Sequence, residues 1–173
     1  IDAATAFGSG EHGTTAGCLE ALQDLQTQGA AFKNVLDMGT GSGILAIAAW
    51  KLWRCPVLAV DIDPESVIVA ARHRDINVVP ADGMVCVEGS TFDQTDIAAR
   101  KSFDLICANI LAAPLKDMAH DLCNVVAKGG FIVLSGMLND QADSVRECYE
   151  REGMTLSNAL QRGDWTTLVM QAC

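Results

Sequence analysis

Short apolar runs alternate with segments of helical periodicity from residue 34 onward. The runs are about as long as strands and are rich in apolar residues, many of them β-branched, which is typical of strands buried on both faces of a parallel sheet. Strands that alternate with helices indicate an α/β fold, with a mostly parallel sheet and helices on both of its faces. We expect these strands at residues 34–38, 57–61, 85–87, 103–110 and 131–135.

The segments between the apolar runs predict helices. Residues 44–53 and 65–74 have helical patterns, and Pro64 is favourable at the start of the second helix. Apolar residues recur at steps of three and four over residues 115–126, so we expect one helix there that packs on the sheet and ends in the Lys-Gly-Gly of residues 128–130. A further helix before the sheet is indicated by Cys18, Leu19, Leu22 and Leu25.

The C-terminal part of the chain has a different pattern. A predicted helix runs through residues 142–149 and stops at Gly153. Two strand-like segments follow, at residues 155–160 and 165–171, on either side of an Arg-Gly-Asp turn centred on Gly163. We therefore expect the α/β sheet to end in a C-terminal antiparallel hairpin.

Length and composition limit the class of protein. A chain of 173 residues, half of them hydrophobic, can bury the core of one globular domain. It contains neither an apolar run long enough to span a membrane nor a signal-peptide pattern at its start, so we expect a soluble, cytoplasmic protein. The formal net charge of -10 argues against direct nucleic-acid binding and would attract a basic protein partner.

Cysteine and histidine do not form a metal-binding pattern. The seven cysteines are odd in number and include no Cys-x-x-Cys pair, which favours reduced, packed thiols over a disulfide framework. The three histidines are scattered along the chain and show no spacing typical of metal ligands. No metal site is predicted.

A glycine-rich loop is the strongest local signal. Residues 37–43, Asp-Met-Gly-Thr-Gly-Ser-Gly, follow a predicted buried strand and open a predicted helix, where backbone amides can face a ligand. A dinucleotide fingerprint would need a glycine at position 44, which is Ile44 here, so the spacing argues against NAD. A loop through Gly39 and Gly41 instead suits the amino-acid end and ribose of S-adenosylmethionine. A glycine-rich turn without a ligand remains the structural alternative.

Two polar residues stand at predicted strand ends. Asp61 closes the second strand, where a carboxylate can accept both hydroxyls of a ribose, and Asp63 is placed to cap the helix that follows. Asn109 lies at the end of the central strand, where its amide oxygen could hold an amine with the lone pair aimed at a methyl donor. An Asn that only caps the next turn is the alternative for Asn109.

With these residues in place, the chain resembles the methyltransferases that modify large-subunit ribosomal protein eleven. The resemblance covers nearly all of the chain and is carried by the glycine loop together with residues 6–15, 60–64, 109–115 and 134–136. It implies a single Rossmann-like class I methyltransferase domain over residues 1–173 that uses S-adenosylmethionine. The departures, Gly13, Thr40 and Ala113 where the family commonly has Pro, Cys and Gly, remove none of the proposed ligands.

The resemblance also implies roles for individual residues. It places cofactor contacts at Thr15, Gly39, Asp61 and Asn109, and the opening loop with Phe7 looks like the segment that folds over the methionine end. His12, in the same loop, has either a direct catalytic role or a structural one. The separate amino-terminal domain by which this family recognises its substrate is absent from residues 1–173.

We therefore expect an S-adenosylmethionine-dependent N-methyltransferase that acts on the α-amine and lysine amines of a large-subunit ribosomal protein. In-line methyl transfer needs mainly orientation, which Asn109 would supply. The alternatives are a methyltransferase for a small molecule or an RNA base, and a catalytically silent cofactor-binding domain. The sequence does not indicate an oligomeric state.

Overall fold

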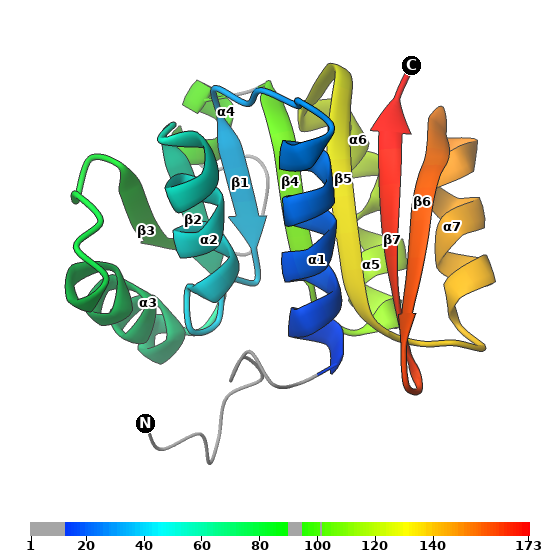
Figure 1. Cartoon of the computed structure of the whole chain (residues 1–173), viewed down its shortest axis with the longest axis horizontal. Helices are drawn as coiled ribbons and strands as arrows, with labels where there is room; N and C mark the ends of the chain where they lie inside the picture. The colour runs from blue at the N-terminus through cyan, green and yellow to red at the C-terminus, as the bar shows by residue number, and fades with distance from the viewer. Residues whose placement is uncertain (1–12, 90–94, 101) are drawn as a thin grey trace.

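A seven-stranded sheet organises the chain, in the order β3-β2-β1-β4-β5-β7-β6 (Figure 1). The structure is a computed structural model that describes residues 13–89, 95–100 and 102–173. Strands β3, β2, β1, β4 and β5 pair in parallel, and β7 pairs antiparallel with both β5 and β6. The strands are β1 (Val35–Met38), β2 (Val57–Asp61), β3 (Met84–Glu88), β4 (Phe103–Asn109), β5 (Val126–Leu138), β6 (Met154–Arg162) and β7 (Trp165–Ala172).

Helices cover both faces of the sheet. One face carries α1 (Gly13–Thr27), α2 (Ile44–Trp53) and α3 (Pro64–Ile76). The other carries α4 (Thr95–Arg100), α5 (Ala112–Asp117), α6 (Ala119–Val125) and α7 (Ala142–Arg151). The predicted α/β class, the mostly parallel sheet and the C-terminal hairpin are thereby confirmed (Figure 1).

Two cores explain why the strands are apolar throughout. Alternate side chains of a strand point to opposite faces, so Val35 packs under α1 and α2 whereas Leu36 packs under the second layer of helices. In the same way Leu105 and Ile106 of β4 belong to different cores, and both are fully buried. A strand buried on both faces shows no polar alternation, which is the pattern that the sequence displays.

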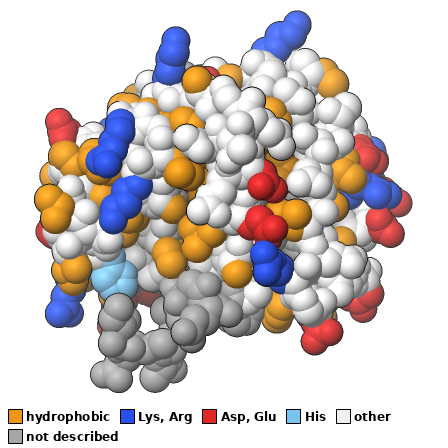
Figure 2. Space-filling view, viewed as in Figure 1, with side chains coloured by type: hydrophobic (Ala, Val, Ile, Leu, Met, Phe, Trp, Pro, Cys, Tyr) orange, Lys and Arg blue, Asp and Glu red, His pale blue; other side chains and the backbone are white. Residues whose placement is uncertain are grey.

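The polar surface is mixed in sign over the face that carries α1 and α2. Figure 2 shows Lys, Arg, Asp and Glu side chains scattered there among hydrophobic ones. Arg162, at the end of β6, forms an ion pair with Glu20 of α1. Within the described part of the chain, no helix is both long and apolar enough to cross a membrane. All seven cysteines are free, and Cys18, Cys55 and Cys107 are buried.

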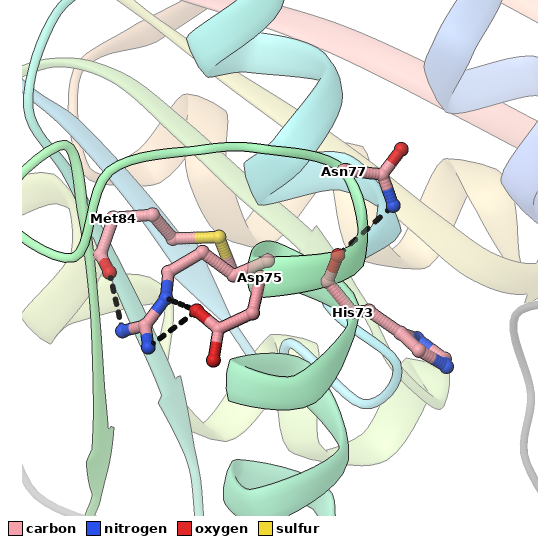
Figure 3. Close-up of polar contacts among 5 residues, drawn as sticks. His73, Asp75, Asn77 and Met84 are labelled. Atoms are coloured by element: carbon pink, nitrogen blue, oxygen red, sulfur yellow. Dashed lines mark hydrogen bonds and ion pairs between the residues drawn. The ribbon is translucent and has the colours of Figure 1, made fainter.

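The ends of α3 show how local sequence sets a helix boundary. Asp63 caps the start, since its carboxylate accepts hydrogen bonds from the amides of Glu65 (3.1 Å) and Ser66 (3.2 Å), as the sequence predicted. At the other end, Asn77 Nδ2 donates to the His73 carbonyl over 2.9 Å (Figure 3).

Arg74 ties the last turn of α3 to the neighbouring edge strand. Its Nε donates to Asp75 Oδ1 over 2.9 Å, and its Nη1 donates to the carbonyl of Met84 in β3 over 3.3 Å (Figure 3). The guanidinium therefore bridges a helix and the strand at the edge of the sheet.

The prediction of one helix over residues 115–126 was wrong. The helix breaks at Met118, which has φ -90° and ψ 0°, and Val126 is extended and pairs with Phe103 as the first residue of β5. Residues 128–130 consequently lie inside the strand instead of ending a helix. A Cβ on Gly130 would lie 2.9 Å from the Asp104 carbonyl, so this glycine permits close strand contact. Long-range pairing with β4 has overridden the local helical period.

Candidate active site

A cavity of about 580 Å³ lies where the parallel strands end. Its lining includes Gly39 after β1, Asp61 at the end of β2 and Asn109 at the end of β4, three neighbouring strands of the sheet. The carboxyl edge of an open α/β sheet is where such folds bind ligands, and the volume is that of a small-molecule site.

The glycine loop forms one wall of the cavity. Gly39, Gly41 and Gly43 have φ values of 71°, 53° and 80°, a left-handed conformation that favours glycine. The amides of Gly39 and Thr40 both donate to the Val60 carbonyl, over 2.8 and 2.9 Å. A Cβ on Gly39 would lie 2.4 Å from Cγ2 of Ile110, so the loop and the β4 end meet at a glycine.

Asp61 is held by the two loops beside it. Its Oδ2 accepts from the Gly41 amide over 2.8 Å, and its Oδ1 accepts from the Asp63 amide over 3.0 Å. The side chain is partly exposed and lines the cavity. A carboxylate oxygen accepts more than one hydrogen bond, so Asp61 can hold the loop and still accept from hydroxyls of a ligand.

The two polar atoms of the Asn109 side chain differ in their hydrogen bonding. Its Nδ2 donates to Thr15 Oγ1 over 3.4 Å, whereas its Oδ1 is buried and has no hydrogen-bond partner among the described residues. A buried polar atom without a partner costs about 1–3 kcal/mol. Asn109 Oδ1 is therefore placed where it can accept a hydrogen bond from a ligand in the cavity.

Asp37 supports the glycine loop from inside the core, a role that was not predicted. The buried Oδ2 accepts from Thr40 Oγ1 over 2.6 Å and from the Ala46 amide over 3.1 Å, so it links the loop to α2. Burial raises the pKa of Asp37 from 3.8 to about 6, against the lowering effect of these hydrogen bonds. The available signal was an acid in a buried strand just before a glycine loop.

A second wall of the cavity is apolar and was also not predicted. It is formed by Ile110, Leu111, Pro114 and Met118, with Ile62 at the rim near Asp61. Ile62 is 71% exposed and Leu111 is 59% exposed, so both are open to a ligand at the mouth. Apolar residues at a strand end and along a short helix carry no sequence signal that distinguishes a ligand wall from packing.

The structure brings together four of the predicted site residues, Gly39, Gly41, Asp61 and Asn109. Thr15 is buried in the first turn of α1 and contacts Asn109, and its cofactor contact stays a prediction. Phe7 and His12 lie outside the described residues. Over the described ranges, no three His, Cys, Asp or Glu side chains gather as a metal site would require.

The sheet order, the glycine loop and the acid at the end of β2 define the class I methyltransferase fold. N-methyltransferase NodS of Bradyrhizobium japonicum, solved with S-adenosyl-L-homocysteine, shares this fold with a TM-score of 0.72 at 14% identity, over 94% of this chain and 89% of that one. The chain belongs to the ribosomal protein L11 methyltransferase (PrmA) family, whose model matches residues 1–172.

Two similar proteins bear names that match this family. The ribosomal protein L11 methyltransferase of Rhizobium meliloti is 46% identical over 168 residues, which cover 97% of this chain and 57% of the relative. A ribosomal protein L11 methylase from Lactobacillus delbrueckii subsp. bulgaricus has a solved structure with a TM-score of 0.82 and 30% identity, over 95% of this chain and 81% of that one. The chain thus spans little more than half the length of the Rhizobium relative.

Proposed function

We propose that residues 1–173 form the catalytic domain of an S-adenosylmethionine-dependent N-methyltransferase whose acceptor is an amine of ribosomal protein L11. The observation that carries this proposal is the buried Asn109 Oδ1 at the edge of the cavity, which has no hydrogen-bond partner in the part of the chain that the structure describes. The family of the chain and the names of its relatives supply the substrate class. A protein that modifies a ribosomal protein would work in the cytoplasm, beside the ribosome.

The cavity fits the cofactor. Gly39 faces it with no Cβ, the Asp61 carboxylate lines it, and its volume of about 580 Å³ is sufficient for a nucleoside with an amino-acid tail. Asp61 would accept from the ribose hydroxyls, and the loop through Gly39 and Gly41 would lie against the amino-acid end. When bound, S-adenosylmethionine supplies a methyl group on a sulfonium, which is already an activated leaving group.

Asn109 would orient the acceptor. Its Oδ1 can accept one hydrogen of an amine, which fixes the direction of the nitrogen lone pair. Because in-line displacement depends on alignment, this one hydrogen bond can contribute much of the rate. Asn109 Nδ2 donates to Thr15, so Oδ1 is the side-chain atom that can accept from the substrate.

The amine has to be neutral to react. An α-amine has an ordinary pKa near 8, whereas lysine lies near 10.4. The apolar wall of Leu111, Pro114 and Met118 disfavours the charged form by desolvation, which lowers the pKa of an amine held against it. Asp61 is the only carboxylate among the described lining residues, and it is already engaged by two backbone amides.

An RNA base is a poorer fit as acceptor. None of the described residues that line the cavity has an aromatic ring on which a base could stack. The net charge of -10 would also repel a phosphate backbone. Both features favour a basic protein as the partner.

Calorimetry and methyl transfer test the proposal together. The purified chain should bind S-adenosylmethionine and S-adenosylhomocysteine but not NAD, and labelled methyl groups should appear on purified L11. Binding of NAD without any response to S-adenosylmethionine would contradict the cofactor. Binding of S-adenosylmethionine with labelling of RNA alone in a lysate would contradict the acceptor.

A further inference from the structure

Ser135 lies directly beside Asn109 in the sheet. The two residues are register partners in the parallel pairing of β4 with β5, and the Ile110 amide donates to the Ser135 carbonyl over 3.1 Å. The pairing of β5 with β7 shifts register between Leu134 and Met137, which places Ser135 within an irregular stretch of the strand. The next residue, Gly136, lines the cavity.

The hydroxyl of Ser135 is fully buried and connects three elements. Its Oγ lies 2.9 Å from Thr167 Oγ1 in β7, 3.3 Å from the Thr14 carbonyl in α1 and 3.4 Å from the Thr166 carbonyl. A hydroxyl has one hydrogen to donate. When Thr167 donates to Ser135 and Ser135 donates to Thr14, one continuous chain of hydrogen bonds runs from β7 through β5 to α1.

Close backbone packing makes this connection possible. A Cβ on Gly17 of α1 would lie 2.4 Å from Thr167 Oγ1, so only glycine allows the helix to approach β7 so closely. The Cys18 thiol in the same turn is fully buried, and burial raises its pKa to about 12, which keeps it neutral. The first turns of α1 are thereby fixed against the ends of β5 and β7.

We propose that Ser135 and Thr167 are positioning residues that hold the Asn109 amide with Oδ1 toward the acceptor amine, an inference that rests on the proposed function. They act through α1, because the carbonyl bonded by Ser135 belongs to Thr14 and the next residue, Thr15, accepts from Asn109 Nδ2. A displaced Thr15 would release Nδ2, and the amide would rotate away from its productive orientation. Misplacement of this kind lowers the rate of an oriented reaction far more than it lowers ligand affinity.

Paired substitutions separate positioning from packing. Ser135→Ala removes the hydroxyl at the centre, and Thr167→Val removes the second hydroxyl while it keeps the shape of the side chain. Thr167→Ser keeps the hydroxyl and serves as the conservative rescue. Ser144→Ala deletes the same atom as Ser135→Ala at an exposed position of α7, where the hydroxyl donates to the Gln141 carbonyl over 2.9 Å.

Two readouts are measured on each folded variant. Steady-state methyl transfer to L11 should show kcat reduced about tenfold in Ser135→Ala and Thr167→Val, with the dissociation constant of S-adenosylmethionine within about twofold of wild type. The Asn109 side-chain NH2 resonances, assigned by their loss in Asn109→Ala, should shift in the same two variants. Thr167→Ser and Ser144→Ala should match wild type in both readouts.

The outcomes distinguish this inference from the proposed function. Wild-type kcat together with unchanged Asn109 resonances in Thr167→Val would overturn the positioning role while methyl transfer itself stands. A wild-type chain that transfers no methyl group would contradict the proposed function, and the Asn109 resonances would still decide whether the hydroxyls position this amide. If Ser135→Ala fails to fold, the Thr167→Val and Thr167→Ser pair gives the same decision.

Discussion

Asn109 Nδ2 lies 3.4 Å from Thr15 Oγ1, although the two residues are 94 positions apart in the chain. This contact joins the end of the central strand β4 to the first turn of α1. It also satisfies the amide nitrogen and leaves Oδ1 as the buried atom without a partner among the described residues. The two ends of the Asn109 side chain therefore differ, since the nitrogen is held by α1 and the oxygen is the atom that we propose to face a substrate.

Asn109→Ala should lower methyl transfer more than it lowers stability. The variant loses the acceptor that aligns the amine, so we expect kcat to fall at least about tenfold, which corresponds to about 1.4 kcal/mol. The lost bond to Thr15 is offset by removal of an unsatisfied oxygen, so Tm should change little. Asn158→Ala, at an exposed position of β6, is the matched control. Full turnover by Asn109→Ala would reduce this residue to a capping role.

Asp61→Ala should weaken cofactor binding at least about tenfold, because hydrogen bonds to a charged acceptor are each worth about 1.5–3 kcal/mol. Calorimetry with S-adenosylmethionine measures the change. Asp63→Ala is the control, since it removes a nearby exposed carboxylate that caps α3. That variant should lose stability because α3 loses its cap, and it should keep its cofactor affinity. Equal dissociation constants for the two variants would show that Asp61 does not bind the ribose.

Asp37 should make stability fall as pH rises from about 4 to about 6. Its pKa is raised by burial from 3.8 to about 6, so in this window the folded protein retains a proton that the unfolded chain has released. The native state binds more protons, and the free energy of unfolding declines with pH, by roughly 3 kcal/mol in all. The contribution is fully present below pH 4 and is lost above pH 6.

Asp37→Asn tests this dependence, because an amide does not ionise in the window. The free energy of unfolding of wild type and variant is measured with urea at pH 4, 5, 6 and 7. We expect the variant to become more stable relative to wild type as pH rises. A change in stability caused by altered hydrogen bonds to Thr40 and Ala46 is the same at every pH, so it does not affect how the difference depends on pH. Parallel curves across the window would show that the Asp37 carboxyl does not titrate near pH 6.

Gly136→Ala and Gly153→Ala should differ sharply although both glycines have nearly the same φ, 90° and 89°. A Cβ on Gly153 meets no described atom within 4 Å, so the variant should lose only about 1–2 kcal/mol for the left-handed backbone. A Cβ on Gly136 would lie 2.2 Å from the Ile110 carbonyl, directly after Asn109. We expect larger destabilisation and loss of cofactor binding, measured by thermal unfolding and calorimetry. Similar losses in both variants would show that the backbone at Ile110 shifts to accommodate the added atom.

The sequence predicted those elements whose local signals agree with their tertiary setting. Residues 44–53 form α2 as expected, because a glycine stands at its start and its apolar residues face the core. The hairpin of β6 and β7 turns at Gly163 as expected. The helix predicted over residues 115–126 failed, because Val126 joins β4 through long-range pairing and the helical spacing of the preceding residues does not reveal this.

Some features of the candidate site could likewise be predicted from the sequence, and others could not. Gly39, Asp61 and Asn109 could be predicted because polar or glycine residues at the ends of parallel strands meet at one edge of the sheet. The contact between Thr15 and Asn109 could not, since it depends on how α1 packs across β4 and β5. The hydroxyl of Ser135 was equally hidden, because nothing in its sequence neighbourhood specifies that Thr14 and Thr167 converge on it.

The position of β7 between β5 and β6 has a consequence for the order in which the sheet is completed. β6 precedes β7 in the chain but lies outside it, and it hydrogen-bonds to the sheet only through β7. During synthesis β6 therefore has no neighbouring strand to pair with until β7 has left the ribosome. Thr167 lies on β7, so its contact with the Ser135 hydroxyl behind Asn109 can form only after β7 has paired with β5.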